Sequence, residues 1–211
     1  MVALRYLYSM DVNELPILTN AETTVWQDRS FFEAKQTLAQ KIATCLAALE
    51  GELRLYLSKG STIFSEAAIL PAGKISKGEN LDGYPYLLLD YPRSVQKNRV
   101  LLYRTICWLG HGCTSSLIYQ GNPLTINGWK LNNKNYLISY GADIWNNDPG
   151  ASCYSSIQDI PENTDGIRIM RDFGMIEPRD LPELAVQEWI KLEAVLSTSG
   201  STDALGKFLD L

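Results

Sequence analysis

The chain has 211 residues, of which 45% are hydrophobic and 20% are charged, a composition typical of globular domains that argues against disorder. The formal net charge is -5 and no basic run is present, so a nucleic-acid-binding surface, which needs clustered cations, is not expected. The sequence shows no signal peptide and no apolar segment approaching the ~20 residues of a membrane helix. We therefore expect a cytoplasmic protein that does not insert into a membrane.

The chain begins with residues 1–29, which show no sustained periodicity and are predicted to be irregular cover, with a loose strand pattern at residues 2–9. Ser30 and Glu33 have the spacing of a capping box, which predicts a helix start at Ser30. Apolar residues then recur at helical spacing: Leu38, Ile42, Cys45, Leu46, Leu49, Leu53 and Leu57. This stripe predicts a long helix that ends near Ser58, packs on a sheet, and uses Gly60 as a left-handed cap.

The stretch Lys74–Pro92, K-I-S-K-G-E-N-L-D-G-Y-P-Y-L-L-L-D-Y-P, is predicted to be a polar loop followed by a central strand. Small and polar residues from Ser76 to Asn80 favour the loop, and Asp82-Gly83 is a turn dipeptide. Tyr84–Tyr91 is a short apolar run covered on both faces, and Pro92 is expected to end it.

Further strands are predicted at Val100–Leu109, Thr114–Tyr119, Tyr136–Trp145 and Ile167–Met170, with a weaker edge strand at Cys153–Ile157. Polar and glycine-containing turns separate them, at Arg93–Asn98, Gly110-His111-Gly112, Gly121-Asn122-Pro123 and Asn127-Gly128. Asp180 with Glu183 then caps a second helix, whose apolar face carries Ala185, Trp189, Leu192 and Leu196. Residues 200–211 are predicted to be a short C-terminal extension.

These elements predict a single α+β domain over residues 1–211. Its antiparallel meander sheet has about five strands, and the N-terminal and C-terminal helices pack on one face of it.

The residue inventory excludes several chemistries. His111 is the only histidine, and a hairpin turn between two glycines is a poor place to hold a catalytic imidazole. Two glycine-rich motifs bind phosphate groups, G-x-x-x-x-G-K-[ST] and a G-x-G-x-x-G that opens a helix, and the sequence contains neither. Cys107 and Cys113 face each other if their strands form a hairpin, but no metal-ligand spacing accompanies them. No catalytic residue, cofactor or metal is therefore predicted.

Polar residues in and near the strands give a candidate ligand-binding group, namely Lys77, Glu79, Asn80, Asp90, Arg104 and Asp143. Asp90 and Arg104 fall on one face if their strands form a hairpin in register. Asp143 stands inside a predicted strand, where a charge needs a partner or water. A buried Asp–Arg pair is more often structural than catalytic.

Lys74–Pro92, together with V-L-L-Y-R-T-I-C-W-L-G downstream, resembles the core of a conserved bacterial protein family with no assigned activity. The shared pattern is K-I-S-x-G-E-N…G-x-P-Y-x-x-L-D-Y-P, and the similarity covers about residues 30–145. Family members carry more aromatic residues where this chain has Ile106-Cys107-Trp108. The resemblance implies a soluble bacterial protein and supplies no catalytic residues.

Three functions remain open. Tyr and Trp residues concentrate in the predicted sheet, which favours a non-catalytic interaction or assembly protein that binds a protein partner or self-associates into a homo-oligomer through an aromatic-rich sheet face or rim. The alternative is a small-molecule site between sheet and helices that opens near Glu79, Asp90 and Arg104. The third is a carboxylate-based hydrolase using Glu79, Asp90 and Asp143.

Overall fold

The computed structural model describes residues 15–61, 63–97, 99–125, 136–155, 161 and 163–198. The chain falls into two compact units, residues 1–39 and 40–211. A compact unit need not be a domain that folds by itself, so the single domain stays a prediction. The expectations for residues 2–9, Asn127-Gly128, 200–211 and the end of Cys153–Ile157 lie outside the described residues.

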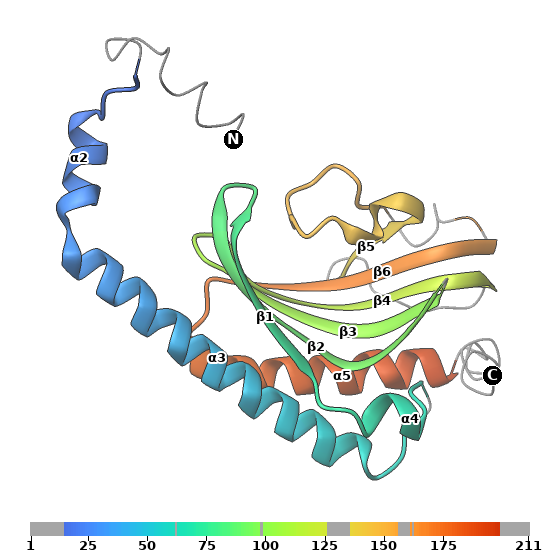
Figure 1. The fold of residues 1–211 in the computed structure, drawn as a ribbon. Coiled ribbons are helices and arrows are strands. Elements are labelled where there is room, and N and C mark those ends of the chain that lie inside the picture. The colour runs from blue at the N-terminus through green and yellow to red at the C-terminus, as the bar shows by residue number, and fades with distance from the viewer. Residues whose placement is uncertain are drawn as a thin grey trace, which may run out of the picture. The chain divides into compact units, whose positions relative to one another are not determined.

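The described residues of the second unit form one six-stranded antiparallel sheet, in the order β1-β2-β3-β4-β6-β5 (Figure 1). Its strands are β1 (Lys74–Leu81), β2 (Tyr84–Gln96), β3 (Arg99–Trp108), β4 (Gly112–Thr125), β5 (Leu137–Tyr140) and β6 (Asn163–Gly174). The predicted α+β class is confirmed. The strand order leaves the meander at its end, because β6 pairs with both β4 and β5.

Helices cover one face of this sheet, hereafter the helix face. They are the part of α3 (Arg29–Leu57) that belongs to the second unit, α4 (Glu66–Ile69) and α5 (Leu181–Thr198), the last preceded by the 3-10 turn η4 (Pro178–Asp180). The hydroxyl of Tyr91 on β2 donates to the carbonyl of Ile69, and that of Tyr103 on β3 donates to the carbonyl of Ala185. Arg54 of α3 also places its Cζ 4.8 Å from the centre of the Tyr91 ring, so the strands and all three helical elements share one core.

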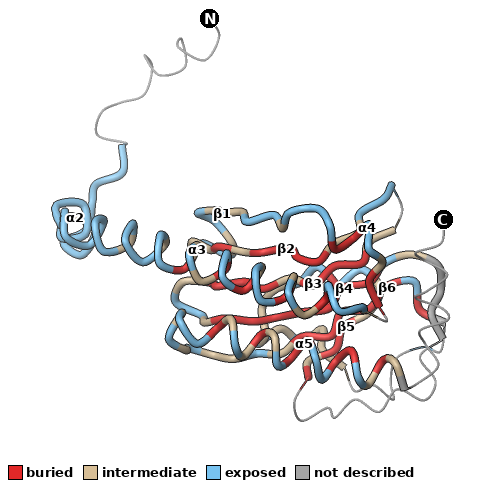
Figure 2. Tube along the Cα trace, turned by 90° about the horizontal axis from the view of Figure 1, so that it is seen from below, coloured by how far each residue is buried: buried red, intermediate tan, exposed pale blue. Residues whose placement is uncertain are grey.

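The core is built from the two predicted helical stripes. Its α3 and α5 members have exposed fractions of 4% or less: Ile42, Leu46, Leu49, Leu53, Leu57, Leu181, Ala185, Trp189, Leu192 and Leu196. Strands β2 to β6 also carry buried residues, in red in Figure 2. Burying a Leu side chain stabilises the fold by about 2 kcal/mol before entropy is counted, so these stripes hold the helices on the sheet.

The predicted loop at Ser76–Asn80 is wrong, because these residues belong to strand β1. β1 is an exposed edge strand, so its side chains can be polar while its backbone pairs with β2, from Lys74 opposite Asp90 to Leu81 opposite Tyr84. The predicted turn at Asp82-Gly83 is confirmed, since both residues have the positive φ of a two-residue hairpin.

Strand β2 does not end at Pro92, as the sequence predicted, but continues to Gln96. The pairing of β2 with β3 shifts register between Asp90 and Arg93. A bulge of this kind allows a proline within a strand, because no backbone N–H has to donate a hydrogen bond to the neighbouring strand at that position.

The irregular cover expected up to residue 29 is wrong for α2 (Asn20–Gln27), a helix that buries none of its residues. Thr19 and Glu22 form its capping box: the Glu22 backbone N–H donates to Thr19 Oγ1, and the Thr19 N–H donates to the Glu22 carboxylate. The predicted Ser30 cap of α3 is also wrong. Asp28 caps that helix, because its carboxylate accepts the Phe31 N–H at 3.0 Å.

Substitutions on α3 test the buried stripe. We expect Leu49→Ala to lower the free energy of unfolding by about 3 kcal/mol, because Leu49 is fully buried and leaves a cavity. Leu55→Ala is the matched control on the same helix, since Leu55 is 61% exposed, and it should change stability by less than about 0.5 kcal/mol. Urea denaturation measures both, and equal losses would contradict the packing described.

Candidate functional site

The sheet face opposite the helices, hereafter the outer face, carries the predicted pair Asp90 and Arg104. The two residues are directly opposite each other on β2 and β3. Arg104 Nε donates to Asp90 Oδ1 at 2.6 Å and Nη2 donates to Oδ2 at 2.8 Å. Arg104 Cζ also lies 5.7 Å from the centre of the Trp145 ring. The predicted same-face placement is confirmed, and the carboxylate has its counter-ion within the chain.

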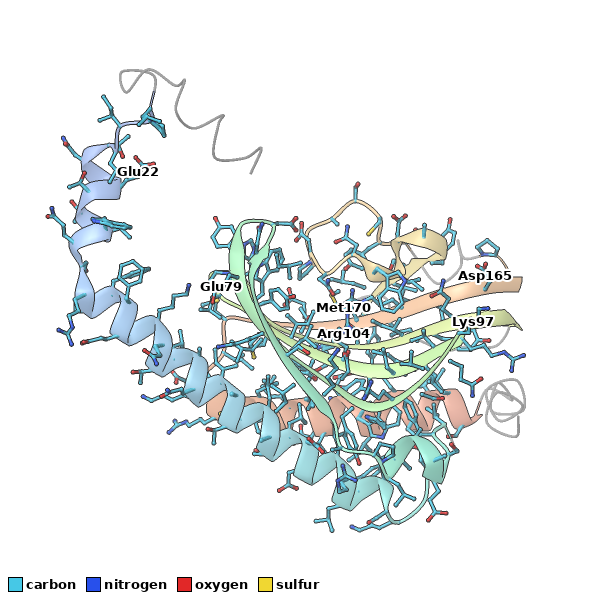
Figure 3. The ribbon with its side chains drawn as sticks, viewed as in Figure 1. Glu22, Glu79, Lys97, Arg104, Asp165 and Met170 are labelled. Atoms are coloured by element: carbon cyan, nitrogen blue, oxygen red, sulfur yellow. The ribbon has the colours of Figure 1, made fainter. Side chains whose placement is uncertain are left out.

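The structure does not bring the other four candidates to this pair. Lys77, Glu79 and Asn80 are exposed on β1, and Asn80 Oδ1 accepts the Gly83 N–H in the adjoining turn. Lys77 pairs with Leu87, three positions along β1 from the residue that faces Asp90, so it lies roughly 10 Å away and on the other face. Figure 3 shows Glu79 at the end of the β1–β2 hairpin, apart from Arg104.

Asp143 does not stand in a strand, as the sequence predicted. The predicted strand Tyr136–Trp145 is shorter, because β5 ends at Tyr140 and η2 (Gly141–Trp145) is a 3-10 helix. Gly141 takes a φ of +66°, which favours glycine and turns the chain out of the strand. Asp143 is exposed there, so water solvates its charge.

Residues Gly141–Ser155 close the outer face. Figure 1 shows this segment, in gold, on the side of the sheet opposite α5. Ile144 of η2 packs with Leu102 of β3 and Ile118 of β4, and all three side chains are buried. A sheet face closed by the chain's own residues cannot serve as a binding surface without opening.

Arg168 is a residue that sequence reasoning missed. It lies fully buried on β6, where Nε donates to Ser116 Oγ at 3.0 Å and Nη1 donates to the Asn147 side chain and the Asn146 carbonyl. Among the described residues, Nη2 has no hydrogen-bond partner and no carboxylate forms an ion pair with this guanidinium. Burial, aided by the nearby Arg104 cation, lowers the pKa of Arg168 to about 10.

The sequence held little signal for Arg168. An arginine between Ile167 and Ile169 reads as the solvated side of a strand that is half buried. It is buried because the distant Gly141–Ser155 segment folds over it, and single-sequence patterns do not reveal that contact.

His111 lies at the β3–β4 turn in contact with rings rather than with a nucleophile. Its ring stacks on Trp108 at 3.8 Å and meets Tyr84 edge-on at 4.7 Å between centres. A cavity of about 10 Å³ lies beside it, lined by Trp108, Thr114 and Asn147 among others. Such a space holds at most about one water molecule, which is too small for a substrate.

Cys107 and Cys113 face each other on β3 and β4, as the hairpin predicted. Both are buried free thiols, and their sulfur atoms are 3.0 Å apart. The hydrogen bond between the two thiols lowers the pKa of Cys113, whereas the same hydrogen bond and burial raise the pKa of Cys107.

The interior between sheet and helices is filled by side chains at its α5 end. Trp189 of α5 contacts Phe64 and Tyr103, with ring centres 5.4 and 5.2 Å apart. All three are buried, which leaves no room for a ligand at this point.

Exposed apolar side chains gather instead in the first unit, in residues 15–38, hereafter the docking segment. Half of the large hydrophobic residues exposed in the described chain lie here, although the segment is a small part of it. They are Leu15, Ile17, Leu18, Val25, Trp26, Phe31, Phe32 and Leu38. Figure 2 shows most of α2 exposed, in pale blue.

The docking segment also holds an open apolar hollow. Its volume is about 400 Å³, and it is lined by Leu18, Ala21, Glu22, Val25, Trp26 and Phe32. Trp26 is 75% exposed, and Phe31 and Phe32 are each 48% exposed, with their rings in edge-to-face contact at 5.3 Å. Large exposed apolar patches on soluble domains usually mark interaction sites.

Comparison with protein-family models, with curated proteins and with solved structures found no match to this chain. The bacterial family to which Lys74–Pro92 was likened therefore stays a prediction. In the residues that the structure describes, no cluster of His, Cys, Asp and Glu is arranged to hold a metal ion. None of the described helices is both long and apolar enough to span a bilayer.

The Asp90–Arg104 pair can be tested by a double-mutant cycle. We expect Asp90→Ala to lower the free energy of unfolding by about 3 kcal/mol, because it leaves a mostly buried guanidinium unpaired. Arg104→Ala should also destabilise, and the double variant should lose less than the sum of the single losses by about 1–3 kcal/mol. Additive losses in urea denaturation would show that the two charges are not coupled.

The thiol pair gives a pH prediction. In a background where Cys45 and Cys153 are replaced by alanine, adding Cys107→Ala should move ionisation of Cys113 to higher pH, because the thiolate loses its donor. Thiolate absorbance followed during a pH titration measures the shift. A titration of Cys113 that stays in place, or moves to lower pH, would rule out this hydrogen bond.

Proposed function

We propose that this protein is a non-catalytic interaction or assembly protein, and that the docking segment is its binding element. The observation that carries the proposal is the concentration of exposed aromatic and aliphatic side chains between Leu15 and Leu38. The sequence predicted an interface on the sheet, because Tyr and Trp residues concentrate there. The sheet aromatics with exposed fractions of 5% or less belong to the core: Tyr91, Tyr103, Trp108 and Tyr119.

The rim of the sheet is a weaker candidate for the same function. Tyr84 is 48% exposed, but its ring already contacts His111, and Trp108 beneath is 5% exposed. A rim whose rings pack on each other offers less apolar area to a partner than the docking segment does.

The two catalytic or ligand-binding alternatives have less support. A hydrolase would need two carboxylates at a shared site, yet Glu79, Asp90 and Asp143 lie on β1, β2 and η2, and Asp90 is paired with Arg104. A small-molecule pocket near Asp90 would have to open a pair whose side chains are only 11% and 16% exposed.

Photo-crosslinking in living cells separates the docking segment from the rim. A photoreactive phenylalanine analogue is placed at Phe31 or at Tyr84, two aromatic positions with the same exposed fraction of 48%. We expect protein adducts at position 31 and few at position 84, because the interface lies on the docking segment. Adducts mainly at position 84 would move the interface to the rim, and no adduct at either position would contradict an interaction function.

A further inference from the structure

We propose that the docking segment packs against the same segment of a second copy of this chain, forming a homodimer. The inference rests on the interaction function proposed above and names its partner. The apolar stripe of α3 is longer than the part of it that packs on the sheet.

The stripe of α3 contains Phe32, Ala39, Leu46 and Leu53, spaced seven residues apart and therefore on one side of the helix. Leu46 and Leu53 are fully buried, whereas Phe32 is 48% exposed and Ala39 is half-buried. Ala21 and Val25 of α2 line the same apolar hollow as Phe32 of α3. A stripe with this spacing is suited to pack on another helix, and the chain's own sheet uses only the second half of it.

The exposed area is sufficient for a dimer. A complete aromatic side chain can bury 150–250 Å², so the exposed parts of Trp26, Phe31 and Phe32 together offer roughly 350 Å². That is close to half of the ~800 Å² that each partner buries in a standard interface. Further exposed aliphatic area comes from Leu15, Ile17, Leu18, Val25 and Leu38.

The segment carries two features that can fit each other in a dimer. It presents a hollow of about 400 Å³ and, next to it, the ring of Phe31, which does not line that hollow. In a dimer with two-fold symmetry, a ring from each copy can fill the hollow of the other, because one patch supplies both surfaces.

Charge also favours a second copy. The docking segment carries three acidic residues, Glu22, Asp28 and Glu33, and two basic residues, Arg29 and Lys35. Arg29 and Glu33 already pair at 2.7 Å. This near balance means that two copies do not repel each other strongly. It disfavours an anionic membrane surface, for which amphipathic helices carry an excess of Lys and Arg.

The oligomeric state of the purified full-length chain tests the inference. Sedimentation equilibrium over a concentration series should give twice the 23.6 kDa chain mass, with dissociation on dilution. Val25→Ser with Phe32→Ser should raise the dissociation constant by about 30-fold or more, because both side chains line the hollow. Leu55→Ser, at a position 61% exposed on the same helix, should leave the dimer intact.

Thermal unfolding of the double variant at a concentration where the wild type is monomeric should match the wild type, because Val25 and Phe32 are both about half exposed. A wild-type chain that stays at 23.6 kDa throughout, or a Leu55→Ser variant that dissociates equally, overturns the second-copy inference. If the chain is monomeric yet crosslinks from position 31 to another protein, the interaction function stands and the partner is foreign. A monomer without crosslinks, or one that cosediments with anionic vesicles, overturns both.

Discussion

The burial of the α3 stripe against the helix face is the interaction on which the rest of the fold depends. Leu46, Leu49 and Leu53 are fully buried, and each contributes roughly 2 kcal/mol of transfer free energy. Trp189 on α5 fills the same layer beside Tyr103. With this face occupied, a binding surface on the sheet has to lie on the outer face or the rim.

The outer face is closed in a different way, through the Gly141–Ser155 segment and a layer of internal polar contacts. Asp90 neutralises Arg104, while Arg168 is held by Ser116 and the Asn146–Asn147 backbone and side chain. A buried guanidinium without a described carboxylate partner is costly, so each of its hydrogen bonds matters for the placement of the segment. Because Asp90 and Arg104 pair with each other inside this layer, the geometry supports a structural role for both residues.

Sequence patterns predicted the parts of the fold that depend on local periodicity. The α3 and α5 stripes, the β3 strand and the Asp90–Arg104 pairing follow from spacing and from one hairpin register. The patterns failed where tertiary pairing overrides composition. The polar residues of β1 form a strand because their backbone pairs with that of β2. Strand β2 continues beyond Pro92 because a bulge accommodates the proline. Thr19 and Glu22 did carry a readable capping signal for α2, which the absence of an apolar periodicity before Ser30 obscured. The exposure of Trp26 and Phe32 could not be read from sequence, since an apolar helical residue is ordinarily assigned to the core.

We infer that the apolar stripe of α3 packs against two different surfaces. The sheet buries Ile42–Leu57, and a second copy of the chain buries the docking segment. Amide hydrogen exchange across a protein concentration series tests it most directly. The account predicts that amides between Thr23 and Leu38 exchange more slowly as concentration rises, while those between Ile42 and Leu57 keep one slow rate throughout. Exchange of the Thr23–Leu38 amides that is fast and independent of concentration would contradict it.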